Sequence, residues 1–212
     1  YTVIVSKGPF PDIRAAAAAE EQIDWWDDSQ SAAQTACTAC FAATELAAFL
    51  PGEVTLAETA ENACGTVIVL GRADDANSAA LSESVGRILS VDTSRGRETF
   101  RMVGLVHAGT QYVILTGADR VGMLYAAYAY LERCGLRFIE PGAPCVDASA
   151  VREETVFDIT ESPSYATRGT MSSFINSDEE FLLWTARNRF NSGFFRKVNH
   201  HFALRKKLGI DT

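Results

Sequence analysis

Apolar, β-branched runs along the chain predict a set of strands. Residues 1–5 and 66–70 are short apolar runs, and 99–107 and 111–116 are two β-rich runs separated by Ala108-Gly109-Thr110. Because a short glycine-containing turn between two such runs is typical of a hairpin, we expect these two strands to pair. Shorter strands are expected at 54–56, 136–139 and 156–159.

Stretches with high helix propensity lie between these strands. The Ala-rich residues 12–28 favour one helix, and residues 31–50 favour a second, which Pro51-Gly52 should stop. Residues 72–98 are mostly polar, so we expect a loop there with one short helix within 79–89.

The clearest helix is expected directly after Asp119. The side chain of Asp119 is suited to cap the first turn, and Gly135 is suited to end the helix. The apolar residues between them recur every three or four positions, as in a helix that packs on a sheet: Val121, Leu124, Tyr125, Tyr128 and Leu131.

After residue 162 the predicted elements alternate between strand and helix. A strand-like run at 165–172 is followed by a helix to about residue 189, for which Ser177 and Glu180 form a capping box. Another strand is expected at 193–198, then a helix at 200–208 and the start of a third strand at Gly209. Alternation of strand and helix is the pattern of a parallel (β/α) barrel.

Together these elements predict an α/β fold of the α+β type, a mixed β-sheet covered by helices and followed by an incomplete (β/α) barrel. We expect a sheet domain at 1–150, a linker at 151–162 and the opening β-α-β-α part of a barrel at 163–212. A complete barrel takes about 250 residues, so this part is expected to be truncated. Truncation predicts an exposed apolar face on 163–212, through which two copies could self-associate.

Composition and charge narrow the function further. The 212 residues are 47% hydrophobic and 22% charged and carry a net charge of −8. This composition is typical of a globular protein with an acidic surface. Such a surface repels phosphate backbones, so no nucleic-acid partner is expected. The basic cluster near the C-terminus is interpreted as a solvated helix face: Arg196, Lys197, Arg205, Lys206 and Lys207.

No membrane partner is expected either, because no apolar run reaches the ~18 residues of a membrane helix. The sequence is compatible with two cellular compartments. The protein is secreted or periplasmic if a signal peptide was removed, and cytoplasmic otherwise.

Cofactor and metal motifs are weak. Cys37 and Cys40 have the spacing of a zinc or redox pair, but no second such pair exists, and an Ala-rich helix favours buried thiols instead. His200 and His201 are neighbours and would face different directions on a helix, while His107 is distant. We therefore expect no metal and no cofactor.

Catalytic motifs are equally weak. Gly117 and Gly122 have the glycine spacing of a phosphate loop, but Met123 stands where that loop needs lysine. The sequence contains neither HExxH nor GxSxG. Glu179 and Glu180 suit a helix start, and Glu140 precedes a Pro-Gly turn. No catalytic residue is assigned.

Several segments do match a known pattern. Residues 112–126 resemble the segment "I-x-G-x-x-x-x-G-x-x-Y-G", and 130–142 resemble "L-L-E-x-x-G-V-R-W" with its "P-G" ending. Upstream, 43–50 is similar to an "A-x-E-L-x-x-Y-L" helix, and 66–71 matches a central strand. These segments are typical of the accessory domain that precedes the catalytic barrel in α-glucuronidases, β-hexosaminidases and related glycoside hydrolases.

The resemblance continues into the expected barrel. Residues 162–169 resemble "P-x-F-x-x-R-G", and 184–191 resemble "W-x-A-R-N-R-x-N". In hexosaminidases the arginine of the first motif contacts the sugar at the cleavage subsite, and Arg168 matches it. Ser172 stands where the hexosaminidase pattern has an acidic residue. Two interpretations of Arg168 stay open, a substrate-binding residue and a structural arginine of the barrel.

The resemblance implies a non-catalytic N-terminal part of a glycoside hydrolase, with carbohydrate as the partner of the full-length enzyme. Glycosidases use two carboxyl groups around the scissile bond, and in these families later barrel strands supply them. The alternative is a free-standing carbohydrate-binding or scaffold module, with Trp25 and Trp26 as candidates for a sugar platform. For the two tryptophans, packing in the core or over the sheet is the competing interpretation.

Overall fold

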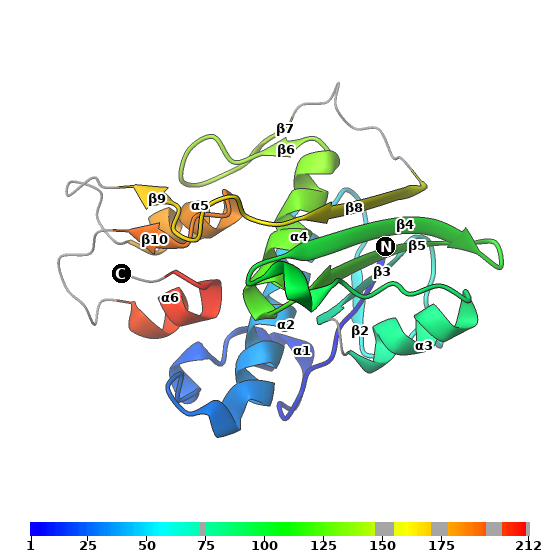
Figure 1. Cartoon of the computed structure of the whole chain (residues 1–212), viewed down its shortest axis with the longest axis horizontal. Coiled ribbons are helices and arrows are strands. Elements are labelled where there is room, and N and C mark those ends of the chain that lie inside the picture. The colour runs from blue at the N-terminus through cyan, green and yellow to red at the C-terminus, as the bar shows by residue number, and fades with distance from the viewer. Residues whose placement is uncertain (73–74, 147–154, 171–177, 194–200, 211–212) are drawn as a thin grey trace.

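The computed structural model describes residues 1–72, 75–146, 155–170, 178–193 and 201–210. A six-stranded mixed sheet with the order β2-β1-β3-β5-β4-β8 forms its centre (Figure 1). Its strands are β1 (Thr2–Ile4), β2 (Thr55–Ala57), β3 (Val67–Arg72), β4 (Phe100–His107), β5 (Thr110–Gly117) and β8 (Phe157–Glu161). β1, β2, β3 and β5 are parallel, whereas β4 runs antiparallel to both β5 and β8.

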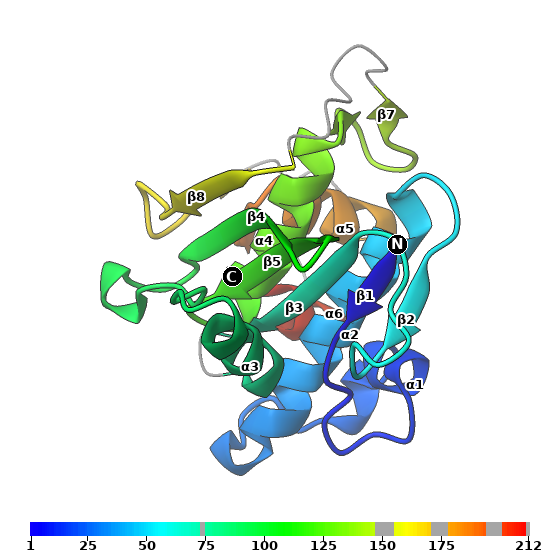
Figure 2. The same cartoon turned by 90° about the vertical axis from the view of Figure 1, so that its right-hand side faces the viewer.

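Helices cover both faces of this sheet. They are α1 (Ile13–Ala17), α2 (Ser31–Phe49), α3 (Ala76–Ser84), α4 (Arg120–Arg133), α5 (Glu179–Arg187) and α6 (Phe202–Leu208). Short 3-10 turns are η1 (Glu20–Gln22), η2 (Asp28–Gln30) and η3 (Thr93–Arg95), and two small ladders pair β6 (Leu136–Arg137) with β7 (Cys145–Val146) and β9 (Gly169–Thr170) with β10 (Ser192–Gly193). α2 and α4 lie on one face and α3 on the other (Figure 2). The α/β fold class is thus confirmed.

The central strands are apolar throughout because both of their faces are covered. In β3, Ile68 and Leu70 point into the main core under α2 and α4, while Val67 and Val69 point into a smaller core under α3. A strand buried on both faces shows a continuous apolar run instead of alternation, which is the pattern that the sequence has at 66–70.

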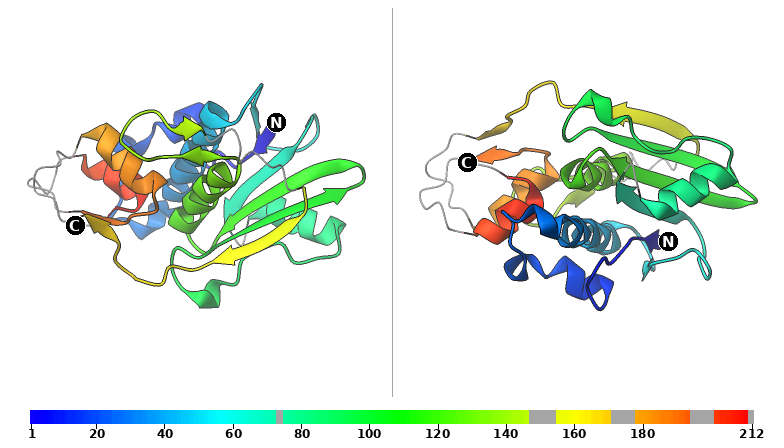
Figure 3. Two further views of the ribbon diagram at one scale, coloured as in Figure 1. Left: turned by 90° about the horizontal axis from the view of Figure 1, so that it is seen from above. Right: turned by 60° about the horizontal axis from the view of Figure 1, so that its bottom comes forward.

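α4 is buried on all sides. Asp119 caps it as predicted, accepting a hydrogen bond from the Gly122 N–H at 2.7 Å, and Gly135 takes the left-handed φ of +92° just after it. Every residue from 121 to 131 is buried, although the spacing predicted one apolar face. α2 packs along α4, and α5 contacts it on the side away from the sheet (Figure 3).

The helix expected over 12–28 is wrong beyond its first turns. α1 ends at Ala17, and 3-10 turns follow. The chain bends there so that Ile23 and Trp25 can join a small core with Cys37, and the Trp25 indole N–H donates to the Glu20 carbonyl at 2.8 Å. Burial of these side chains outweighs the helix propensity of the alanines. The helix expected within 79–89 lies slightly earlier, as α3.

The C-terminal elements also differ in detail. Asp178 caps α5, accepting from the Phe181 N–H at 2.8 Å, so the capping position expected at Ser177 is wrong by one residue. Ser177 itself and most of the strand expected at 193–198 lie outside the described residues. Residue Gly209 ends α6 with a φ of +73° and does not begin a strand.

The exposed apolar face expected on 163–212 is not found in its described residues. Apolar side chains of α5 and α6, such as Leu182 and Leu208, are buried in the main core. Tyr165 is the exposed large apolar side chain of this region in the described part of the chain. Within residues 151–162, expected as a linker, β8 pairs with β4 at the sheet edge.

Candidate functional site

Residues 163–210, called the C-terminal segment below, meet the rest of the chain through side chains of opposite charge. β9 and β10 are parallel neighbours with α5 between them, so they form one strand-helix-strand unit. Four ion pairs cross the contact within the described residues, and in each the cation belongs to the C-terminal segment: Arg168–Glu98, Arg187–Glu45, Arg189–Glu132 and Lys207–Glu20.

Arg168 lies just before β9 and is largely buried. Its Nη2 donates to Glu98 Oε2 at 2.6 Å, its Nε to the Arg189 carbonyl at 3.1 Å, and its Nη1 to the Tyr165 carbonyl at 2.7 Å. The guanidinium also lies 5.8 Å from the ring centroid of Tyr125, within the range of a cation–π contact. At least three of its five N–H donors are therefore directed at groups of this chain.

Glu98 holds Arg168 from a loop whose backbone is constrained. Its φ is +59°, a left-handed conformation that costs a non-glycine residue roughly 1 kcal/mol or more. The Glu98 N–H donates to Asp119 Oδ2 at 3.0 Å, which holds this conformation. Asn191 donates to Glu98 Oε1 at 2.9 Å and accepts from the Arg168 N–H at 2.8 Å. Glu98, Arg168 and Asn191 thus form a closed ring of hydrogen bonds.

A small cavity of about 210 Å³ opens beside Arg168, lined also by Tyr125, Glu161 and Phe190. Burial raises the pKa of the Tyr125 phenol, and the Glu98 charge raises it further. The phenol therefore stays neutral and can act only as a hydrogen-bonding group. A cavity below the usual 300–1,000 Å³ of ligand pockets accommodates at most a small group, such as one sugar hydroxyl with its carbon.

Glu45 and Arg187 form the most buried of the four pairs. Arg187 Nε donates to Glu45 Oε2 at 2.8 Å and Nη2 to Oε1 at 3.1 Å, and the side chains are 7% and 10% exposed for Arg187 and Glu45. Tyr128 OH adds a third hydrogen bond to Glu45 Oε2 at 3.2 Å. Burial lowers the pKa of Arg187, but the hydrogen bond and charge of Glu45 raise it by more. Burial and the charge of Glu45 raise the pKa of Tyr128 well above its usual value.

Lys207 anchors α6 in the same way. Its Nζ lies 2.9 Å from Glu20 Oε2 and donates to the Ala17 carbonyl at 3.2 Å, at the end of α1. Its own carbonyl accepts from Thr38 Oγ1 at 3.0 Å and from Arg120 Nη1 at 3.1 Å. α6 is thus attached to α1, α2 and α4 at one residue. This lysine belongs to the basic cluster that was expected to be a solvated face. The expectation is wrong for Lys207 and Arg205, which are both buried, and Arg196 and Lys197 lie outside the described residues.

The motif residues that carry the resemblance face one another across this contact. Glu45 and Glu132 come from the two helical motifs of the sheet part, and their partners Arg187 and Arg189 come from the "W-x-A-R-N-R" motif. Gly169 of the "R-G" motif lies where a Cβ atom would collide with the Ser192 carbonyl of β10. These motif positions are therefore explained by the packing of the two parts.

Sequence reasoning missed the acidic partners. Glu45 is 142 residues from Arg187, and no local pattern indicates such a pair. One signal was present, because Glu45 is a lone charge in the apolar stretch 42–50 of α2. Buried charges are almost always paired, so a lone charge on a buried helix predicts a distant partner of opposite sign.

The other candidate residues do not meet in one place. Glu140, Glu179 and Glu180 are exposed, and the last two open the first turn of α5 as predicted. Burial raises the pKa of Cys37 to about 11 and of Cys40 to about 12, which fits inert core thiols. Within the described residues no three His, Cys, Asp or Glu side chains converge on a metal position.

Of the two tryptophans, Trp25 is buried, as core packing predicts, and Trp26 is exposed. The Trp26 ring stacks on Phe202 at 5.6 Å between centroids, with Lys206 Nζ 4.6 Å from the Trp26 centroid. His107 lies near Ser84, His201 precedes α6, and His200 lies outside the described residues. No helix in the described part of the chain is long and apolar enough to cross a membrane.

Comparison by sequence gives no relative, because no protein-family model and no curated protein matches the chain. Comparison of structures finds a family GH115 4-O-methyl-α-glucuronidase with specificity for decorated arabinogalactans. It is 14% identical with a TM-score of 0.56 over 99% of this chain and 28% of the enzyme. A GH138 enzyme targeting pectin rhamnogalacturonan II is 10% identical with a TM-score of 0.50, over 99% of this chain and 30% of the enzyme.

This chain thus has the fold of a part of two glycoside hydrolases and spans less than a third of either. At such low identity the likeness establishes the fold and leaves the activity open.

Proposed function

We propose that this chain is a non-catalytic part of a glycoside hydrolase, in which the sheet part (residues 1–150) holds the first strand-helix units of the catalytic barrel. Residues 151–162 connect the two parts and contribute β8 to the edge of the sheet, and 163–212 belong to the barrel. The full-length enzyme would act on carbohydrate by hydrolysing glycosidic bonds. α-Glucuronides are the first substrates to test, because one structural neighbour is named as an α-glucuronidase.

The observation that carries the proposal is the set of four ion pairs between the two parts. A lone strand-helix-strand unit has no closed sheet of its own and must bury its apolar side against something. Here the sheet part supplies that surface and places a carboxylate opposite each cation. Because all four cations lie on one side of the contact, the two parts are electrostatically complementary.

The test compares two polypeptides from the same gene: residues 1–212, and the whole reading frame that contains them. Both are assayed with chromogenic glucuronides and hexosaminides. We expect hydrolysis by the longer polypeptide and none by residues 1–212, because both carboxyl groups of the mechanism are expected on later barrel strands. Hydrolysis by residues 1–212 alone, or a reading frame that ends at Thr212, would contradict the proposal.

The free-standing carbohydrate-binding module is the outcome to examine if the reading frame ends there. The exposed Trp26 ring favours this alternative as a stacking surface for a sugar. A glycan-binding assay of Trp26→Ala, with Trp25 unchanged, then decides whether this ring binds sugar.

We also propose that Arg168 contacts the sugar in the full-length enzyme, through N–H donors not directed at Glu98, Arg189 or Tyr165. Arg168→Lys and Glu98→Gln both break the Arg168–Glu98 pair and serve as matched variants. A sugar contact predicts that Arg168→Lys lowers kcat/KM far more than Glu98→Gln at a similar loss of thermal stability. A purely structural arginine predicts parallel losses in both variants.

A further inference from the structure

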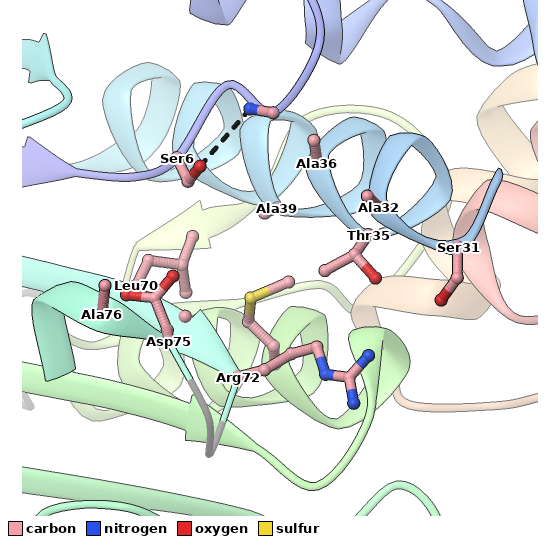
Figure 4. A pocket seen from close by; sticks show the side chains of 13 residues that line it. Ser6, Ser31, Ala32, Thr35, Ala36, Ala39, Leu70, Arg72, Asp75 and Ala76 are labelled. Atoms are coloured by element: carbon pink, nitrogen blue, oxygen red, sulfur yellow. Dashed lines mark hydrogen bonds between the residues drawn. The ribbon is translucent and has the colours of Figure 1, made fainter. Parts of the chain in front are cut away.

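A cavity of about 490 Å³ lies in the sheet part, away from the C-terminal segment. It opens where β1 and β3 end, between the first half of α2 and the start of α3 (Figure 4). Its size falls within the range of small-molecule pockets. The ion pairs at Arg168 and Arg187 are not part of its lining.

The topology of the sheet explains why a cavity forms at this point. β1 lies between β2 and β3. The chain leaves β1 towards α2 on one face of the sheet, and leaves β3 towards α3 on the other face, as Figure 2 shows. Where connections diverge in this way, a crevice opens at the carboxyl ends of the two strands, and α/β proteins bind ligands there.

Small side chains keep the cavity open. α2 faces it with Ala32, Ala36 and Ala39 where a helix on a sheet would normally present large apolar residues. Gly8, with a φ of +58°, allows the loop after β1 to approach the helix, because a Cβ atom there would lie 2.6 Å from the Ala36 Cβ. Leu70 adds an apolar wall.

Polar groups gather at two ends of the cavity. The Arg72 guanidinium lies near the end where α2 presents the hydroxyls of Ser31 and Thr35, and Asp75 lies with Ser6 towards the other end (Figure 4). A hydrogen bond from the Asp75 N–H to the Arg72 carbonyl, 3.1 Å, fixes the spacing of the two charged residues. Asp75 Oδ1 also accepts from the Asn77 N–H at 2.9 Å, which orients its carboxylate at the start of α3.

We propose that this cavity binds a small hydroxylated monocarboxylate of the class of a uronic acid. The guanidinium of Arg72 matches the two oxygens of a carboxylate, and the hydroxyls of Ser31 and Thr35 add donors beside it. At the far end, the Asp75 carboxylate accepts hydrogen bonds from sugar hydroxyls.

The charges favour a monoanion over a phosphate ester. Among the described lining residues, Arg72 is the cation and Asp75 the anion. A phosphate group carries close to two negative charges at neutral pH and would meet one guanidinium and a repelling carboxylate. A carboxylate carries one charge and therefore meets weaker repulsion from Asp75.

The binding test uses the ¹⁵N-labelled 212-residue chain, titrated separately with sodium D-glucuronate, D-glucose and inorganic phosphate. We expect glucuronate to shift amide signals of residues 31–39 and 70–76 at millimolar concentrations. D-Glucose, which lacks the carboxylate, is expected to bind about tenfold more weakly, the factor for one lost charge-assisted contact. Equal binding of glucose, tighter binding of phosphate, or shifts confined to residues around Arg168 would each overturn the proposal.

Two variants make the test specific to this cavity. Arg72→Gln removes the charge and should weaken glucuronate binding about tenfold while leaving glucose binding unchanged. Thr35→Met fills the cavity and should abolish binding of both sugars. Arg14→Gln, at an exposed position of α1, is the matched control and should bind as the unchanged chain does.

Circular dichroism and thermal unfolding establish that each variant is folded. If Arg72→Gln does not fold, the comparison of glucuronate with glucose on the unchanged chain still decides. A folded Arg72→Gln that binds glucuronate normally would refute the proposal. None of these outcomes depends on hydrolytic activity, so they are independent of the function proposed for the barrel.

Discussion

Replacing Glu45 by Leu tests whether the contact between the two parts stabilises the chain. The change removes the carboxylate that accepts from Arg187 Nε and Nη2 and from Tyr128 OH. It leaves the guanidinium of Arg187 in the core, beside the rings of Phe49 and Phe138.

The expected loss of stability depends on how deeply the Glu45–Arg187 ion pair is buried. Side-chain exposures of 7% and 10% place Arg187 and Glu45 among buried pairs, where loss of one partner costs about 3–5 kcal/mol. An exposed pair would cost at most about 1 kcal/mol. Loss of the acceptor for the fully buried Tyr128 hydroxyl adds roughly 1–3 kcal/mol. We therefore expect Glu45→Leu to lower the free energy of unfolding by at least about 3 kcal/mol.

The assay is urea unfolding at 25 °C and pH 7, followed by tryptophan fluorescence, to which Trp184, one turn from Arg187 on α5, contributes. Arg187→Met and the double variant Glu45→Leu/Arg187→Met complete a double-mutant cycle. Glu61→Gln, an exposed loop residue, is the charge control and should change stability by no more than about 0.5 kcal/mol.

The double variant separates an ion pair from simple loss of packing. Because it leaves no charge unpaired, it should cost at least about 2 kcal/mol less than the sum of the single variants. Additive losses would refute the ion-pair reasoning. A loss below about 1 kcal/mol for Glu45→Leu would show that this contact behaves as an exposed one.

Three further predictions concern the sheet part. Asp119→Ala removes the acceptor for the Gly122 and Glu98 N–H groups, so it should destabilise the chain by about 2 kcal/mol. Asp119→Asn keeps an acceptor oxygen and should lose less stability. Equal melting temperatures for the two variants would contradict the capping role. The Arg101 hydrogen bond chiefly, with the charges of Arg101 and Arg87, lowers the pKa of Asp158 against the opposing effect of burial. A carboxylate with a lowered pKa stabilises the folded chain at pH values above its unfolded-state pKa, so Asp158→Asn should be less stable near neutral pH, by under about 1 kcal/mol for this partly exposed pair. The difference should begin to fall at about pH 3.9 and disappear only below the lower pKa of the folded state. Urea midpoints at several pH values measure this, and a pH-independent difference would refute it. Cys64 and Cys145 are exposed, whereas burial raises the pKa of Cys37 to about 11 and of Cys40 to about 12. A thiol reagent at pH 8 should therefore modify Cys64 and Cys145 in the folded chain, and Cys37 and Cys40 only after unfolding. Rapid labelling of Cys37 in the folded chain, mapped by peptide analysis, would contradict this.

The elements that the sequence predicted correctly carry strong local signals. The hairpin of β4 and β5, the capped helix α4 and the buried strand β3 each combine an apolar pattern with a turn or capping residue. The same reasoning failed for residues 12–28, because packing of Trp25 against the region of Cys37 outweighs the helix propensity of alanine. The capping position at α5 moved by one residue, since Ser177 and Asp178 are both good caps and only the structure selects between them.

The sequence by itself determined the α/β class, the order of the central strands and of α2 and α4, and the candidate Arg168, because these depend on neighbouring residues or on motifs read in order. The tertiary structure alone decided what those residues touch. Glu98 and Arg168 are 70 residues apart, and Glu45 and Arg187 are 142 apart, so nothing in either neighbourhood specifies the partner. The cavity at the ends of β1 and β3 likewise follows from the strand order, which brings Arg72, Asp75 and α2 together. Pairing of this kind is set by the packing of the whole chain, which has no local signature.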